Sequence, residues 1–120
     1  MCPTRELALQ TEKEFNKYSY KNYKAVCVFG GSDRRTQINQ INDGCQFIIA
    51  TPGRLADFVT QKIIDLTLIS FVVLDEADRM LDLGFEPQII RILGQMRPDR
   101  QTVLTSATWP FDIQRLSGNF

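Results

Sequence analysis

The sequence contains no histidine and only three cysteines among its 120 residues. Without histidine, the commonest general base and a frequent metal ligand are excluded from any mechanism. Cys2, Cys27 and Cys45 form no Cys-x-x-Cys pair, so neither a zinc site nor a disulfide framework is indicated. Cys27 lies in an apolar segment, where a cysteine packs as a small hydrophobic residue.

An excess of charge of either sign is also absent, because 14 Lys and Arg balance 14 Asp and Glu. A nucleic-acid partner therefore cannot be inferred from net charge, and any grip on phosphate must be local. No apolar run approaches the ~20 residues of a membrane span, and the N-terminus lacks the pattern of a signal peptide. We expect an intracellular protein without a membrane partner, and the sequence does not distinguish nucleus from cytoplasm.

What the chain does have is an ordinary globular composition, with 43% hydrophobic and 23% charged residues. Its most informative stretch is residues 71–78, where four apolar residues run without alternation and then give way to Asp75, Glu76 and Asp78. Such a run suits a strand buried on both faces of a parallel sheet. Carboxylates at its carboxyl end can hold Mg²⁺ and position a water molecule. A solvated acidic turn is the alternative, and for an isolated Asp-Glu pair it is the commoner one.

Apolar strands alternate with amphipathic helices along the chain, which predicts an α/β architecture with a mostly parallel sheet. Each strand ends in a polar or glycine-containing loop that leads into a helix, and in a parallel sheet these loops share one edge. Helix N-termini and glycine backbones there present N–H groups to anions. Helices are expected to begin after the cap Thr4, after Ser32 or Asp33, at Pro52, at Ala77, at Pro87 and after Trp109-Pro110. Strands are expected at 24–29, 47–50, 71–75 and 101–105.

Five motifs follow one another along the chain: Pro3-Thr4-Arg5-Glu6-Leu7-Ala8, Gly30-Gly31, Thr51-Pro52-Gly53-Arg54, Asp75-Glu76-Ala77-Asp78 and Ser106-Ala107-Thr108. In this order, they resemble the motifs of the DEAD-box family of ATP-dependent RNA helicases. Any one of the motifs is weak evidence, but five in the right order are specific and span nearly the whole chain. A finer similarity at 97–102 and Trp109-Pro110 is to the branch that includes helicases with a KH module, although no KH sequence is present.

The resemblance implies a RecA-like domain, the first of two, with helices on both faces of the sheet. Asp75 would hold Mg²⁺ on the ATP phosphates through water, and Glu76 would orient or deprotonate the attacking water. Asp78 would pair with the hydroxyls of Ser106 and Thr108, and so couple the ATP site to strand separation. Capping of the last helix is the alternative role for these two hydroxyls.

The same resemblance assigns three loops to RNA. They are Pro3, Thr4, Arg5 and Glu6, then Gly30 and Gly31, then Thr51, Pro52, Gly53 and Arg54. Guanidinium groups, a hydroxyl and helix N-termini suit phosphate and ribose oxygens, so the contacts would read the backbone and the 2′-OH rather than the bases. For either arginine alone a surface ion pair is the alternative. Arg34-Arg35 could extend the basic edge or form a solvated helix face.

The chain departs from the family by lacking a GxxxxGK[ST] loop, the adenine-reading segment before it and the second RecA-like domain. We therefore expect residues 1–120 to be a partial first domain, without its first strand and phosphate loop. Two hypotheses follow: a piece of an active helicase, or a truncated RNA- or protein-binding module with negligible ATPase activity. A DNA helicase or another nucleotide hydrolase is a third. The missing strand also predicts an unpaired, apolar sheet flank and a marginally stable or self-associating chain.

Overall fold

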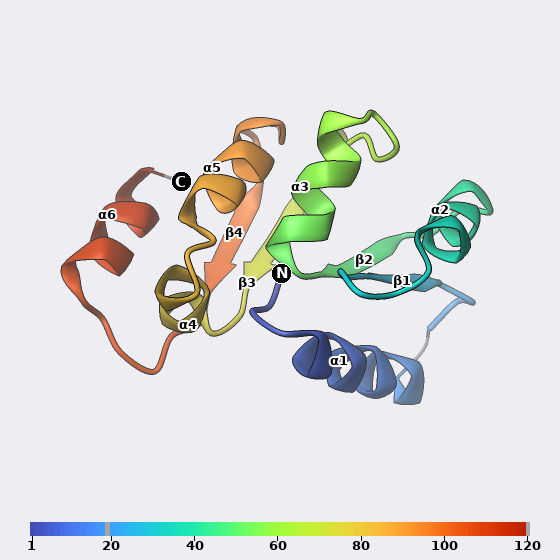
Figure 1. Cartoon of the computed structure of the whole chain (residues 1–120), viewed down its shortest axis with the longest axis horizontal. Helices are drawn as coiled ribbons and strands as arrows, with labels where there is room; N and C mark the ends of the chain where they lie inside the picture. The colour runs from blue at the N-terminus through green and yellow to red at the C-terminus, as the bar shows by residue number, and fades with distance from the viewer. Residues whose placement is uncertain (19, 120) are drawn as a thin grey trace.

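The computed structural model describes residues 1–18 and 20–119, excluding the side chain of Asn119. Phe120, which the periodicity placed on the last helix, lies outside the described residues. Helices and strands alternate as predicted (Figure 1). The order is α1 (Arg5–Lys17), β1 (Ala25–Val28), α2 (Arg34–Asn42), β2 (Phe47–Ala50), α3 (Pro52–Thr60), β3 (Phe71–Leu74), α4 (Ala77–Asp82), α5 (Glu86–Gly94), β4 (Gln101–Leu104) and α6 (Phe111–Asn119).

Local signals set most helix starts. The Thr4 hydroxyl accepts a hydrogen bond from the Leu7 N–H at 3.2 Å, and Asp33, not Ser32, caps α2 through the Arg35 N–H. Pro52 is the first residue of α3 as predicted, but the Thr51 side chain makes no capping hydrogen bond. Pro52 has no N–H to be satisfied, and its fixed φ suits the first helical position.

All strand pairs are parallel, as predicted, and among the described residues the four strands form two pairs rather than one continuous sheet. β1 pairs with β2 and β3 pairs with β4, both in parallel, as two separate two-stranded sheets. Met1 and Cys2 join them: the Met1 N-terminal amine donates to the Val73 carbonyl at 2.7 Å, and the Cys2 N–H donates to the Ala50 carbonyl at 2.9 Å. In Figure 1 the N-terminus lies between β2 and β3. All strands therefore share one direction and one carboxyl edge.

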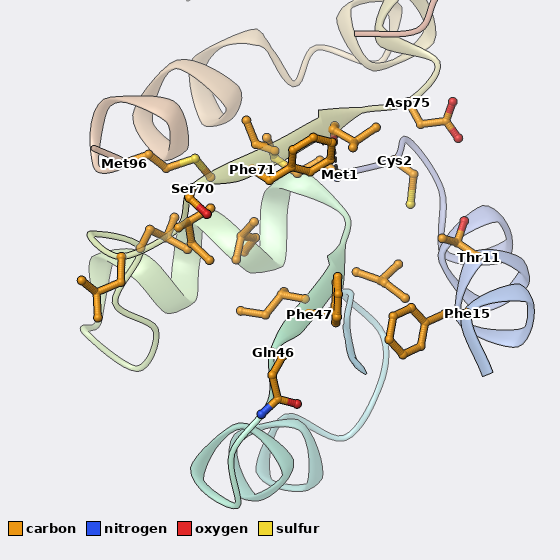
Figure 2. Close-up of a pocket in the computed structure, with 18 residues that line it drawn as sticks. Met1, Cys2, Thr11, Phe15, Gln46, Phe47, Ser70, Phe71, Asp75 and Met96 are labelled. Carbon is orange, nitrogen blue, oxygen red and sulfur yellow. Dashed lines mark hydrogen bonds between the residues drawn. The ribbon is translucent and has the colours of Figure 1, made fainter. Parts of the chain in front are cut away.

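A groove of about 590 Å³ separates β2 from β3 (Figure 2). In a parallel ladder, alternate residues turn their N–H and C=O groups to opposite sides. The Thr51 N–H donates to Val28 of β1, and the Leu74 carbonyl accepts from Thr105 after β4. The residues that alternate with Thr51 along β2 and with Leu74 along β3 therefore turn their N–H and C=O groups to the groove. Among the described residues, the N–H groups of Ile48, Ala50, Phe71 and Val73 face the groove without a strand partner. The expected unpaired flank is thus an internal gap, bridged at one end by Met1 and Cys2, rather than an outer edge.

Helices cover both faces, as predicted for a RecA-like sheet. Val26 and Val28 of β1 belong to the main core, which they share with Leu55 and Phe58 of α3. Cys27, on the opposite face, packs with Ala8 of α1 in a second small cluster. Burial raises the pKa of the Cys27 thiol to about 12, so it packs as a neutral apolar group, as the sequence indicated. The alternation along β1 therefore fixes α1 and α3 on opposite faces of the sheet.

Candidate functional site

The acidic residues after β3 are held by Thr105, at the end of β4. The Thr105 hydroxyl donates to a carboxylate oxygen of Asp75 at 2.5 Å and accepts from the Glu76 N–H at 3.2 Å. The Thr105 carbonyl also accepts from the Ala77 N–H at 2.9 Å. Thr105 thus connects the strand end to the first turn of α4. Sequence reasoning missed it, and its position directly before Ser106-Ala107-Thr108 was the available signal.

Glu76 has a left-handed backbone, with φ 53° and ψ 52°. For a residue with a side chain this conformation costs on the order of 1 kcal/mol and persists where the surroundings impose it. The two hydrogen bonds that Thr105 accepts from the N–H groups of residues 76 and 77 supply that constraint. The kink ends the strand at Leu74 and turns the chain into α4 within two residues.

Asp78 reaches across to the loop after β4. One of its carboxylate oxygens accepts from both the hydroxyl and the N–H of Thr108, at 2.9 and 3.2 Å. The hydroxyl bond from Thr108 is the main cause that lowers the pKa of Asp78, and Ser106 adds a smaller effect. The Ser106 hydroxyl itself donates to the Thr108 carbonyl at 2.6 Å, so its direct bond tightens the loop. Neither hydroxyl caps α6, whose first N–H groups bond to the Pro110 carbonyl.

The carboxylates of Asp75, Glu76 and Asp78 suit a hard cation such as Mg²⁺ only in part. Carboxylate oxygens are the ligands Mg²⁺ prefers, and the second oxygen of Asp75 accepts no hydrogen bond from the described residues. Among those residues, no group of three or more His, Cys, Asp or Glu side chains could hold a metal ion. Among the described residues, Asp75 would therefore be the carboxylate that holds Mg²⁺, directly or through water.

A second cluster lies at the ends of β1 and β2. The Arg5 guanidinium stacks over the Phe29 ring, 5.2 Å from its centroid, and lies beside Gly31, where an added Cβ would stand 3.9 Å from it. Pro3 is buried beneath, whereas Thr4 is partly exposed and Glu6 exposed. Gly31 has a φ of 80°, which favours glycine. Residues 3–6 and 30–31, predicted to act together, are thus adjacent.

Arg54 joins the same cluster from the first turn of α3. Its guanidinium lies 5.6 Å from the Phe58 ring centroid and donates to the side-chain oxygen of Gln37 at 3.3 Å. Thr51 and Pro52 are buried at the helix start. Gly53 stands against Phe85, whose ring would lie 3.8 Å from an added Cβ. Gln37 was not predicted; the signal was a glutamine four residues before Ile41, on the helix stripe expected to be apolar.

Arg34, considered as an extension of the basic edge, instead contacts side chains of α3 and the residue after it. Its guanidinium forms an ion pair with Asp57 at 3.3 Å, bonds to the Gln61 side chain and stacks over Phe58 at 5.2 Å. Arg34 therefore supports α3 from the side, and Arg5 and Arg54 remain the basic residues of the cluster.

With the geometry in place, comparisons with known proteins decide the family. The model of the DEAD/DEAH box helicases matches residues 1–116. The chain belongs to the DEAD/DEAH box helicase family. It is 56% identical over its whole length to human "Probable ATP-dependent RNA helicase DDX43" and 52% identical to "Putative DEAD-box RNA helicase HEL64" of Trypanosoma brucei brucei. A crystal structure of a DEAD box protein from Methanococcus jannaschii superposes with a TM-score of 0.93 at 34% identity, over 98% of this chain and 32% of that one.

The DEAD-box chain spans about a fifth of its curated relatives, 18% of the human protein and 21% of the trypanosome protein. It contains no GxxxxGK[ST] sequence. None of the helices in the described residues is long and apolar enough to cross a membrane. The family assignment rests on shared fold and sequence.

Proposed function

We propose that these residues form part of the ATP- and RNA-binding domain of an intracellular ATP-dependent RNA helicase. The observation that carries the proposal is the placement of two clusters on one carboxyl edge of parallel strands. The acidic cluster (Asp75, Glu76, Asp78) follows β3. The basic cluster combines Gly31 after β1 and Arg54 after β2 with Arg5 from the start of α1. A chain that handles nucleotide at one cluster and an RNA strand at the other needs this arrangement.

In the proposed reaction, Asp75 would hold Mg²⁺ through water, and Glu76 would orient or deprotonate the attacking water. The metal neutralises charge that develops on the transferred phosphoryl group. The chain lacks the loop that cradles the triphosphate, so ATP turnover requires that loop and a second RecA-like domain from elsewhere. Asp78, Ser106, Ala107 and Thr108 form the link whose movement couples hydrolysis to the RNA.

The basic cluster is proposed to bind the RNA backbone and 2′-OH groups. Arg5 and Arg54 each stack on an aromatic ring. Stacking leaves the guanidinium group charged and restricts its orientation. Exposed Gly30 and Gly31, with the partly exposed Gly53, allow close approach of a strand, and the N-termini of α1 and α3 supply N–H groups. Sequence specificity should be low, because these groups reach backbone oxygens and not base edges.

The proposal is tested by RNA binding in a longer protein that carries this chain together with a phosphate loop and a second domain. Arg54→Ala should weaken binding of single-stranded RNA by about ten-fold, uniformly across sequences, and reduce the salt slope by about one. Fluorescence anisotropy at several salt concentrations measures both. Lys13→Ala, on the exposed part of α1, is the control. An unchanged affinity for Arg54→Ala, or a preference for DNA duplexes in strand displacement, contradicts the proposal.

Thr105 provides a separate prediction for the acidic cluster. Thr105→Val keeps the side-chain volume but removes the hydroxyl that orients Asp75 and the Glu76 N–H. We expect kcat of RNA-stimulated ATP hydrolysis to fall roughly ten-fold and half-saturating Mg²⁺ to rise, because a misplaced catalytic group loses transition-state stabilisation. Thr105→Ser, which restores the hydroxyl, should recover most of the activity. Equal losses in the two variants would show that the hydroxyl has no role.

A binding module without turnover is the second candidate for the isolated 120 residues, and the absence of a GxxxxGK[ST] loop favours it. Without that loop, most of the positioning that phosphoryl transfer depends on is missing. Purified residues 1–120 should therefore show negligible ATPase activity, with or without RNA. RNA-stimulated hydrolysis that Glu76→Gln abolishes would overturn this expectation.

A further inference from the structure

Gln37 is a polar side chain on the inner face of α2, and only 3% of its surface is exposed. Burying an amide is unfavourable unless its donor and acceptor are both satisfied. Its nitrogen donates to the Phe29 carbonyl at 3.1 Å, and its oxygen accepts from the Arg54 guanidinium at 3.3 Å. The amide orientation follows from these partners, since a guanidinium can only donate and a carbonyl can only accept.

These two partners belong to different loops of the basic cluster. Phe29 is the residue before Gly30-Gly31, and its ring carries the Arg5 guanidinium. Arg54 lies in the first turn of α3, which follows β2. Gln37 thus connects two parts of the basic cluster. It bonds to the Phe29 carbonyl at the end of β1, where the Arg5 guanidinium stacks on the Phe29 ring, and it also bonds to Arg54.

We propose that Gln37 is a positioning residue for RNA binding: it fixes the direction of the Arg54 guanidinium relative to the Gly30-Gly31 loop. This inference rests on the proposed function. A long arginine loses rotamer freedom when it binds a phosphate or ribose oxygen. Arg54 has already lost part of that freedom, because the Gln37 oxygen and the Phe58 ring hold it before RNA arrives. Preorganisation of this kind increases affinity by lowering the ordering cost on binding.

The test is a double-mutant cycle in the longer protein, with RNA affinity measured at one fixed salt concentration. Gln37→Met has a similar volume and lacks both hydrogen-bonding groups. It should weaken RNA binding roughly three- to ten-fold, the range of one lost hydrogen bond. In the Arg54→Ala background the same change should have less than a two-fold effect, because the residue it positions is gone. kcat at saturating RNA should stay unchanged.

Gln40→Met is the matched control, because Gln40 lies on the exposed face of α2. It should leave RNA affinity unchanged. Nuclear magnetic resonance of the Arg54 guanidinium, without RNA, should show faster rotation about its terminal bonds in Gln37→Met. This readout separates positioning of Arg54 from a general loss of packing.

Gln37→Glu covers the case in which Gln37→Met does not fold. It keeps an acceptor for Arg54, removes the donor to the Phe29 carbonyl and adds a negative charge. The Arg54 guanidinium should therefore stay held and rotate more slowly than in Gln37→Met, although the added charge lowers the affinity for phosphate. The inference is overturned if Gln37→Met leaves affinity unchanged, or weakens it equally with and without Arg54. It is also overturned if the Arg54 guanidinium rotates as fast in Gln37→Glu as in Gln37→Met. If Arg54→Ala itself has no effect, the proposed RNA surface fails, and the role of Gln37 fails with it.

Discussion

Replacing Glu76 with glutamine is expected to lower kcat of RNA-stimulated ATP hydrolysis by roughly 10²–10⁴-fold in a longer protein that carries this chain and a phosphate loop. Glutamine has the same shape as glutamate but cannot accept a proton or hold a water molecule through a negative charge. The backbone kink at residue 76 should survive, since Thr105 holds it through the main-chain N–H and the neighbouring Ala77. A steady-state phosphate-release assay measures the loss.

A loss in kcat without a matching change in RNA affinity or in the KM for ATP would assign the effect of Glu76→Gln to the chemical step. RNA affinity and the KM for ATP should change little, because the water-activating group acts mainly in the transition state. Glu14→Gln, in an exposed ion pair with Lys17 on α1, is the control and should keep full activity. A Glu76→Gln variant that retains more than a tenth of the original kcat would exclude Glu76 as the general base.

Filling the groove between β2 and β3 should produce the largest change in stability. We expect an N-terminal extension of four apolar, β-branched residues to raise the free energy of unfolding of the 120-residue chain by roughly 4 kcal/mol, after the cost of ordering the new residues. Continuing the register of Met1 and Cys2, the extension would pair with the open amides of Ile48, Ala50, Phe71 and Val73. It would also cover Phe47 and Phe71, which are 44% and 54% exposed.

The N-terminal amine provides a second readout of the same change. Burial lowers the pKa of the Met1 amino group from its ordinary value of 8.0, because apolar surroundings disfavour the charged form. The unfolded chain therefore binds this proton more tightly than the folded one. Stability should accordingly rise with pH from the lowered folded pKa up to about pH 8. An extension turns the amine into an uncharged peptide N–H, so this rise should disappear.

Thermal unfolding and hydrogen exchange of the four amides measure the extension. A four-residue Gly-Ser extension should remove the pH dependence but add little stability. The apolar extension with proline next to Met1 should lose part of the gain, because proline has no N–H for the Ile48 carbonyl. Without an extension, the chain should associate as its concentration rises. A sharp two-state transition of a monomeric, unextended chain, unaffected by the apolar extension, would contradict this account.

The positions of the elements could be predicted because their signals are local. Thr4 caps α1 with a side chain three residues from its partner, and the apolar run at 71–74 requires burial wherever it lies. The meeting of Asp78 with Thr108 was implied by a resemblance to a family and is observed as two hydrogen bonds. Composition and periodicity could not have supplied it, since 30 residues separate the two.

Tertiary structure decided which polar groups become partners. Thr105 was read only as the end of a strand and is the residue that holds Asp75 and Glu76. Arg34 and Arg54 are both arginines near a helix start, yet one is paired with Asp57 and the other is held by a buried glutamine. The sequence alone determined the order of strands, helices and polar loops, because these depend on neighbours along the chain. The gap between β2 and β3 and the direction of each charged side chain depend on contacts between distant segments, so only the packed structure could settle them.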